Sequence, residues 1–151
     1  MKKVSPVEAL ILGLSLLLYL ISLPLEAFYL DHKEDGIIGL LCVGIGWLGI
    51  GTGWSYISWL ANPLLLASWI IPFKFPIPKI TMAAASAFLA LLFIVFDSVK
   101  DNSQGKLSII TGLGPDYLCW VLSPLLFLLG NVIWLIVREQ KASRKISARK
   151  P

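Results

Sequence analysis

The fold of this chain is decided by residues 36–73, GIIGLLCVGIGWLGIGTGWSYISWLANPLLLASWIIPF. None of these 38 residues is charged. Because about 20 residues cross a bilayer as a helix, the stretch is too long for one perpendicular helix and too short for two comfortable ones. It contains seven glycines, four of the six tryptophans and the helix-breaking pair Asn62-Pro63. The way in which this stretch folds therefore determines the architecture.

The composition indicates an integral membrane protein. Of the 151 residues, 57% are hydrophobic, and the mean hydropathy is +0.80, whereas soluble domains are about 45 to 50% apolar. The net charge of +4 comes from basic residues near the chain ends and in one loop, without the interleaved aromatic residues of a nucleic-acid surface. We therefore expect an all-α membrane bundle that is surrounded by lipid and does not bind nucleic acid.

Four hydrophobic regions predict four transmembrane helices in one domain, residues 1–137. The first helix begins at a capping box, with Ser5 as the cap, Pro6 as the first helical residue and Glu8 three residues after the cap. Two lysines before an apolar core also fit a cleaved signal peptide, but Glu8 interrupts the positive region and residues 25–27 are a poor cleavage site. The expected spans are residues 6–23, 54–72 (with a lead-in at 36–51), 80–96 and 116–137.

The connections between these spans are predicted to be loops. Residues 25–35 are polar and acidic, and residues 97–106 are polar. Residues 107–114 are apolar but contain two glycines, so we expect a boundary loop that folds back on the bundle. The prolines between Phe73 and Lys79 predict a turn, because proline cannot continue a helix.

The basic residues indicate the orientation. With four crossings, ten of the 13 Lys and Arg residues lie on one side, which the positive-inside rule assigns to the cytoplasm. Both termini are then cytoplasmic, whereas five crossings would put Lys74, Lys79 and the C-terminal tail outside. The last span is expected to begin at Pro115, with the Asp116 carboxylate complementing the positive end of the helix, and to bend at Pro124. Residues 138–151 are predicted to form a soluble basic tail that contacts anionic lipid through Arg138, Lys141, Arg144, Lys145, Arg149 and Lys150.

Residues 36–73 can fold in two ways that agree with this orientation. In the first, one long helix from Gly36 crosses the membrane, and a short helix capped by Asn62 lies on the inner surface. In the second, a glycine-rich lead-in dips from the outer face, and the crossing helix follows from Trp54 with a kink at Pro63. Trp54 and Trp69 stand about 22 Å apart along a helix, which matches the two interfaces and favours the second arrangement.

Small residues predict close helix packing. Gly49 and Gly53 satisfy the G-x-x-x-G association motif in an apolar context. In the third span, small side chains recur at helical spacing, so that a neighbouring helix can approach this face closely. These residues are Ala83, Ser86, Ala87 and Ala90.

The sequence contains no catalytic, cofactor-binding or metal-binding constellation, so we expect that the protein is not an enzyme. The single histidine, His32, lies among acids in a loop expected to be solvated. Cys42 and Cys119 stand apart in apolar segments and are expected to pack as small hydrophobes. No ionisable residue is expected deep in the membrane, where transporters place them. The candidates for a polar or kink site are Asn62, Pro63, Ser123 and Asn131.

Two segments carry a resemblance to a known type of protein. They are Gly46-Trp47-Leu48-Gly49 and Trp59-Leu60-Ala61-Asn62-Pro63-Leu64-Leu65-Leu66. They resemble small bacterial multi-span proteins that carry a Trp-Leu-Ala-Asn-Pro segment in the second hydrophobic region. The resemblance implies a bacterial inner membrane and brings no activity with it.

Two functions from different classes follow from these observations. The first is a non-catalytic, multi-pass accessory protein whose glycine and alanine faces bind another membrane protein or a second copy of the chain. The second is a small transporter or channel component in which the broken central region lines a polar path. Convergence of Asn62, Ser123 and Asn131 on one water-accessible cavity would favour transport, and a dry bundle would favour the accessory role.

Overall fold

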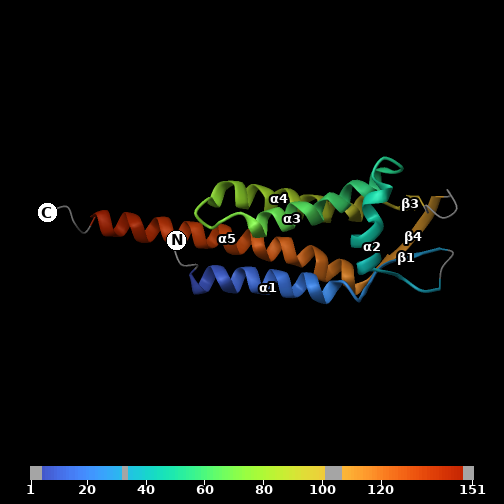
Figure 1. Cartoon of the computed structure of the whole chain (residues 1–151), viewed down its shortest axis with the longest axis horizontal. Helices are drawn as coiled ribbons and strands as arrows, with labels where there is room; N and C mark the ends of the chain where they lie inside the picture. The colour runs from blue at the N-terminus through green and yellow to red at the C-terminus, as the bar shows by residue number, and fades with distance from the viewer. Residues whose placement is uncertain (1–4, 32–33, 101–106, 148–151) are drawn as a thin grey trace.

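The structure is a computed structural model of the chain, and it describes residues 5–31, 34–100 and 107–147. Of these residues, 72% are helical, so the expectation of a mainly helical protein is confirmed. The long helices form an elongated bundle, and a small sheet lies at one end of it (Figure 1). Helix α5 (Pro115–Ser147) extends beyond the bundle at the opposite end.

Helix α5 is the central element of the bundle. Helix α1 (Pro6–Ser22) and helix α4 (Pro76–Leu92) both pack along it, and helix α3 (Ala61–Ile70) packs on α4. The other elements are the helix α2 (Gly39–Ile45), the 3₁₀ helices η1 (Gly46–Gly49), η2 (Trp54–Leu60) and η3 (Phe93–Val95), and the strands β1 (Glu26–Leu30), β2 (Ile37–Ile38), β3 (Ser98–Lys100) and β4 (Leu107–Leu113).

The capping box predicted at the start of α1 is confirmed. The Glu8 backbone N–H donates to Ser5 Oγ at 3.2 Å, and the Ser5 backbone N–H donates to Glu8 Oε2 at 2.8 Å. The other oxygen, Glu8 Oε1, accepts a hydrogen bond from Trp134 Nε1 at 3.1 Å. The local signal that starts α1 therefore also fixes this end of α1 to α5.

Among the described residues, two helices are long and apolar enough to cross a membrane. They are α4 continued by η3, Pro76–Val95, and the segment Pro115–Lys141 of α5. A third span exists if the two halves of the central region, Gly39–Gly49 and Trp54–Ile70, count as one. Helix α1 is apolar but has 17 residues, a length of about 25 Å. The structure thus supports two or three spanning helices.

The central region is broken, as its glycines and its length predicted. The halves Gly39–Gly49 and Trp54–Ile70 meet at an angle of 116°, which corresponds to the second of the two expected arrangements. Gly51 turns the chain with φ +99°, a backbone conformation that favours glycine. In the second half, the 3₁₀ helix η2 gives way to α3 next to Pro63. Because Pro63 has no N–H to donate to the Trp59 carbonyl, Asn62 Nδ2 donates to it at 3.1 Å.

The expectation of an all-α fold is wrong, because a four-stranded sheet with the order β2-β1-β4-β3 lies at one end of the bundle. The paired strands are antiparallel. Residues 107–113, expected to form a boundary loop, form β4, whose alternating exposed and covered residues follow the two-residue period of a strand. Parts of the loops expected at residues 25–35 and 97–106 form β1 and β3, and β2 lies at the start of the lead-in expected at residues 36–51. Residues 32–33 and 101–106, with His32, lie outside the described residues.

Two further boundaries differ from the prediction. Helix α4 begins at Pro76 rather than residue 80, because prolines are tolerated in the first helical turn. Lys79, expected on the cytoplasmic surface, is therefore turned into the bundle, where it is 1% exposed. Its Nζ lies 3.8 Å from the ring centroid of Phe73 and 5.0 Å from that of Phe127. Helix α5 runs through Pro124 to Ser147, so most of the tail predicted from residue 138 continues the last helix.

The small residues pack within the chain. The expected α4 face is buried between α4 and its neighbours, and it consists of Ala83, Ser86, Ala87 and Ala90. The Ser86 hydroxyl donates to the Ala61 carbonyl at 2.7 Å, which holds α4 close to α3. Gly49 and Gly53 do not form a helical G-x-x-x-G face, because they stand on either side of the break. Gly49 instead makes room for the Tyr56 ring.

Candidate functional site

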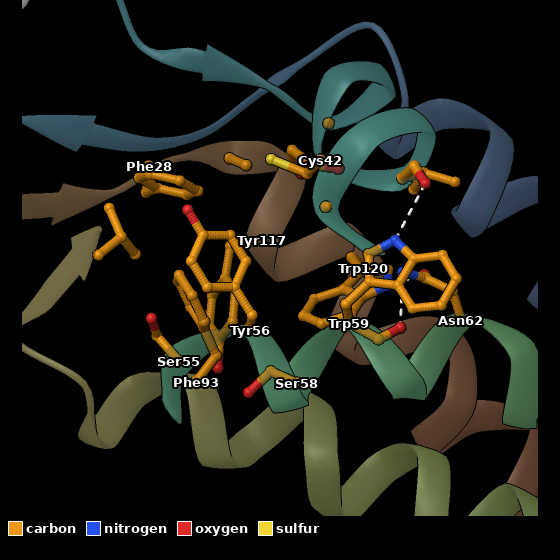
Figure 2. Close-up of a pocket in the computed structure, with 16 residues that line it drawn as sticks. Phe28, Cys42, Ser55, Tyr56, Ser58, Trp59, Asn62, Phe93, Tyr117 and Trp120 are labelled. Atoms are coloured by element: carbon orange, nitrogen blue, oxygen red, sulfur yellow. Dashed lines mark hydrogen bonds between the residues drawn. The ribbon is translucent and has the colours of Figure 1, made fainter. Parts of the chain in front are cut away.

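A cavity lies where the two halves of the broken region meet the sheet and the start of α5. Its volume is about 120 Å³, and it is partly open to the outside. Figure 2 shows the side chains that surround it. The wall is built from six segments of the chain that lie close together in space. Its residues are Ala27, Phe28, Gly39, Cys42, Val43, Gly46, Ser55, Tyr56, Ser58, Trp59, Asn62, Phe93, Val99, Asp116, Tyr117 and Trp120.

Six of the 16 residues in this wall are aromatic. Four of them form a continuous row, in which the ring centroids of neighbours are 5.5, 5.8 and 6.1 Å apart. These distances are those of favourable aromatic pairs. The row runs from the sheet to α5 and consists of Phe28, Phe93, Tyr117 and Trp120.

The polar atoms of the aromatic side chains are bonded to the protein. Trp59 Nε1 donates to the Val43 carbonyl at 3.0 Å, so the second half of the broken region holds the first. The Tyr117 hydroxyl donates to the Ala90 carbonyl at 3.0 Å, and the Tyr56 hydroxyl donates to the Lys100 carbonyl. Because these groups are already satisfied, the cavity is lined mainly by carbon.

Asn62 joins four parts of the chain at the edge of the cavity. Its Oδ1 accepts hydrogen bonds from the Tyr19 hydroxyl at 3.2 Å and from Trp120 Nε1 at 2.8 Å. Its Nδ2 donates to the Trp59 carbonyl. The side chain thus links α1, η2 and α5 to α3, and these three hydrogen bonds stabilise the fold. The predicted polar residue Asn62 does line the cavity, but its amide is occupied.

Asp116 is the acidic residue of the cavity wall. It is 5% exposed and lies in the first turn of α5, where a carboxylate compensates the positive end of the helix. The carboxylate lies beside the Ser22 hydroxyl and against Gly39, where a Cβ would stand 2.5 Å from Asp116 Oδ1. Gly39 is the first residue of α2, so this carboxylate is placed at the start of two helices.

The other predicted polar residues lie away from the cavity. The Ser123 hydroxyl bonds to Ser15 of α1, and Asn131 Nδ2 donates to the Phe127 carbonyl of its own helix at 2.7 Å. Neither residue belongs to the cavity wall. Asn62, Ser123 and Asn131 therefore do not converge on one site.

Sequence reasoning missed most of this site. Asp116 was interpreted only as a helix-capping acid, and Cys42 only as a packing residue. The one available signal was the concentration of tryptophans and glycines in residues 36–73. Within the described residues, no group of three or more His, Cys, Asp or Glu side chains could hold a metal ion. Cys42 and Cys119 are free thiols.

No protein-family model, curated protein or solved structure gives a significant match to this chain.

Proposed function

We propose that this chain is a non-catalytic, multi-pass membrane protein that binds a small apolar molecule, or the apolar end of a larger one, in the cavity described above. The observation that carries the proposal is the cavity itself, with six aromatic rings in its wall and a volume of about 120 Å³. An apolar protein cavity of about 150 Å³ binds benzene. A group the size of one six-membered ring therefore fits, and its substituents can leave through the open side.

The membrane setting is part of the same proposal. We place α1, the broken region, α4 and α5 across the membrane as four crossings, with both termini in the cytoplasm of a bacterium and the protein in its inner membrane. The start of α1, the α3–α4 connection and the extension of α5 lie at the same end of the bundle (Figure 1). Among the described residues, Lys74 lies in the α3–α4 connection, and Arg138, Lys141 and Arg144 lie in the α5 extension. The exposed basic residues of the α5 extension, Arg138, Lys141 and Arg144, would contact anionic lipid there.

Two other functions, partner binding through small-residue faces and transport along a polar path, have less support than the binding of a small molecule. Partner binding through alanine faces requires those faces to be exposed, yet Ala83 and Ala90 are buried within the chain. A polar transport path requires the deep polar residues to line a common cavity, yet Ser123 and Asn131 lie elsewhere. The non-catalytic role that we propose is therefore the binding of a ligand in the cavity.

The test uses Cys42 as a reporter, because it lies in the cavity wall and Cys119 does not. The probe is tert-butylbenzene, a neutral ring compound, added to the purified chain in dodecyl maltoside. We expect it to slow the reaction of Cys42 with N-ethylmaleimide in the Cys119→Ser variant, by roughly tenfold at about ten times its Kd. It should leave Cys119 unaffected in the Cys42→Ser variant.

Two matched substitutions locate the effect. Val43→Phe places a ring in the cavity wall and should abolish the protection of Cys42, whereas Val95→Phe makes the same change at an exposed position and should preserve it. Equal slowing at both cysteines would show a general solvent effect. That result, or unchanged Cys42 reactivity at saturating probe, would overturn the proposed function.

A further inference from the structure

We propose that the cavity selects organic cations, with an ammonium group on or next to the bound ring and with Asp116 as its counter-ion. This inference rests on the proposed function and names the class of its ligand. It follows from two features that meet in one cavity, an aromatic wall and a buried carboxylate. Asp116 and all six rings line the same space.

The aromatic wall is suited to a positive charge. The face of an aromatic ring carries partial negative charge and attracts a cation within about 6 Å of its centroid, most strongly for tryptophan. The wall contains two tryptophans, Trp59 and Trp120, whose N–H groups are turned to protein acceptors and so do not oppose a cation in the cavity. Several rings around one space form the arrangement that recognises quaternary ammonium groups.

Within the described part of the chain, no cationic side chain accompanies this carboxylate in the cavity. None of the described residues in the wall is a Lys, Arg or His. Asp116 is 5% exposed, so water contributes little to its solvation, and a buried charge requires compensation. The Ser22 hydroxyl and the starts of α5 and α2 supply part of it. A bound ammonium would supply a full opposite charge at short range.

The same features act against anions. A carboxylate or phosphate in this space would face Asp116 and the ring faces, both of which repel it. A neutral ring gains only the apolar contacts, which do not depend on Asp116. Among ligands of the same shape, we therefore expect a cation to bind most tightly, a neutral molecule less tightly and an anion least tightly. The charge of Asp116 determines this order.

The test compares two isosteric probes in the Cys42 protection assay. Phenyltrimethylammonium and tert-butylbenzene have the same shape and differ in one positively charged nitrogen. We expect Asp116→Asn, which keeps the shape of the side chain and one acceptor oxygen but removes its charge, to weaken the binding of phenyltrimethylammonium at least about tenfold. It should leave tert-butylbenzene unchanged. The control Asp35→Asn removes an exposed acid outside the cavity wall and should affect neither probe.

Each outcome decides between the proposals. If tert-butylbenzene protects Cys42 but phenyltrimethylammonium does not, or if Asp116→Asn weakens both probes equally while the fold is retained, the cation inference is overturned and the proposed function stands. If tert-butylbenzene leaves Cys42 unprotected in the unsubstituted chain, the proposed function falls and takes this inference with it. Should Asp116→Asn fail to fold, the unsubstituted chain still decides, because phenyltrimethylammonium must protect Cys42 and benzoate must not.

Discussion

Ser15 and Ser123 hold α1 against α5 by exchanging hydrogen bonds across the helix interface. Ser15 Oγ donates to the Ser123 carbonyl at 3.0 Å, and Ser123 Oγ donates to the Ser15 carbonyl at 2.8 Å. Both side chains are 0% exposed. Trp69 Nε1 of α3 donates to Ser15 Oγ at 3.1 Å and brings a third helix to the same point. Small hydroxyl side chains thus allow close approach and also join the helices, as is usual in membranes.

Replacing Ser123 by alanine removes one hydroxyl from this exchange. We expect Ser123→Ala to lower the free energy of unfolding by about 1 kcal/mol, because hydrogen bonds between membrane helices average about 0.6 and reach about 1.7 kcal/mol. The measurement is unfolding of the purified chain by SDS in mixed micelles. Ser58→Ala is the matched control, since Ser58 is also buried, at 2% exposed, and its hydroxyl has no hydrogen-bond partner among the described residues. An equal loss in both variants would refute the role of the exchange.

Replacing Asn62 by alanine should cost more than the same change at Asn131. Asn62→Ala leaves three partners, the Tyr19 hydroxyl, Trp120 Nε1 and the Trp59 carbonyl, without their bond. We expect a loss of roughly 2 to 4 kcal/mol in the free energy of unfolding. Asn131→Ala removes one bond within its own helix and should cost below about 1 kcal/mol. SDS unfolding of the two variants side by side checks the order, and a reversed order contradicts the linking role of Asn62.

The glycines of the first half of the broken region differ in the space around them. A Cβ at Gly39 would stand 2.5 to 2.7 Å from the Asp116 carboxylate, whereas a Cβ at Gly44 would have no atom within 4 Å. We expect Gly39→Ala to lower the melting temperature and to raise the reactivity of Cys42, because α2 must move away from α5. Gly44→Ala should be neutral or stabilising by up to about 1 kcal/mol, since alanine favours a helix. Equal effects of the two changes would show that α2 does not pack against Asp116.

The helices and their local signals could be predicted from the sequence. The capping box of Ser5 and Glu8, the break before Trp54 and the small face around Ala83 each depend on residues a few positions apart. Such short spacings determine helix starts, turns and helix faces directly. They need no knowledge of the rest of the chain.

The sheet could not be predicted in this way, because its pairing is not local. Strand β1 pairs with β4, which follows it only after two of the long helices, in the register Tyr29 with Gly112. Leu107–Leu113 is short, and its Gly112 and the following Gly114 are typical of loops. The remaining signal was its content of β-branched residues, Ile109, Ile110 and Thr111.

The cavity was hidden for the same reason. Its wall combines Phe28 from the sheet, Cys42 from α2, Trp59 from η2 and Asp116 from α5. Each residue alone has an ordinary structural interpretation. Only the tertiary arrangement shows that they surround one space, and therefore that Asp116 does more than cap a helix.

The two lysines near the α3–α4 connection should differ sharply in chemical reactivity. Lys74 is exposed, whereas Lys79 is 1% exposed and lies against the rings of Phe73 and Phe127. An N-hydroxysuccinimide ester reaches Lys79 only when the bundle opens, so we expect Lys74 to react at least about tenfold faster. Mass spectrometry of the digested chain measures both rates. Similar rates would show that Lys79 is not held within the bundle.

The same chemistry tests the proposed orientation. A sulfonated ester that cannot cross lipid should label Lys74 in inverted membrane vesicles and not in right-side-out vesicles, because the positive-inside rule places the α3–α4 connection in the cytoplasm. Lys100, in strand β3 at the opposite end of the bundle, is the internal control and should show the reverse pattern. Labelling of both lysines from one side would mean that the two ends of the bundle face the same compartment. The broken region and α4 could then not both cross, and the proposed arrangement of four crossings would have to be abandoned.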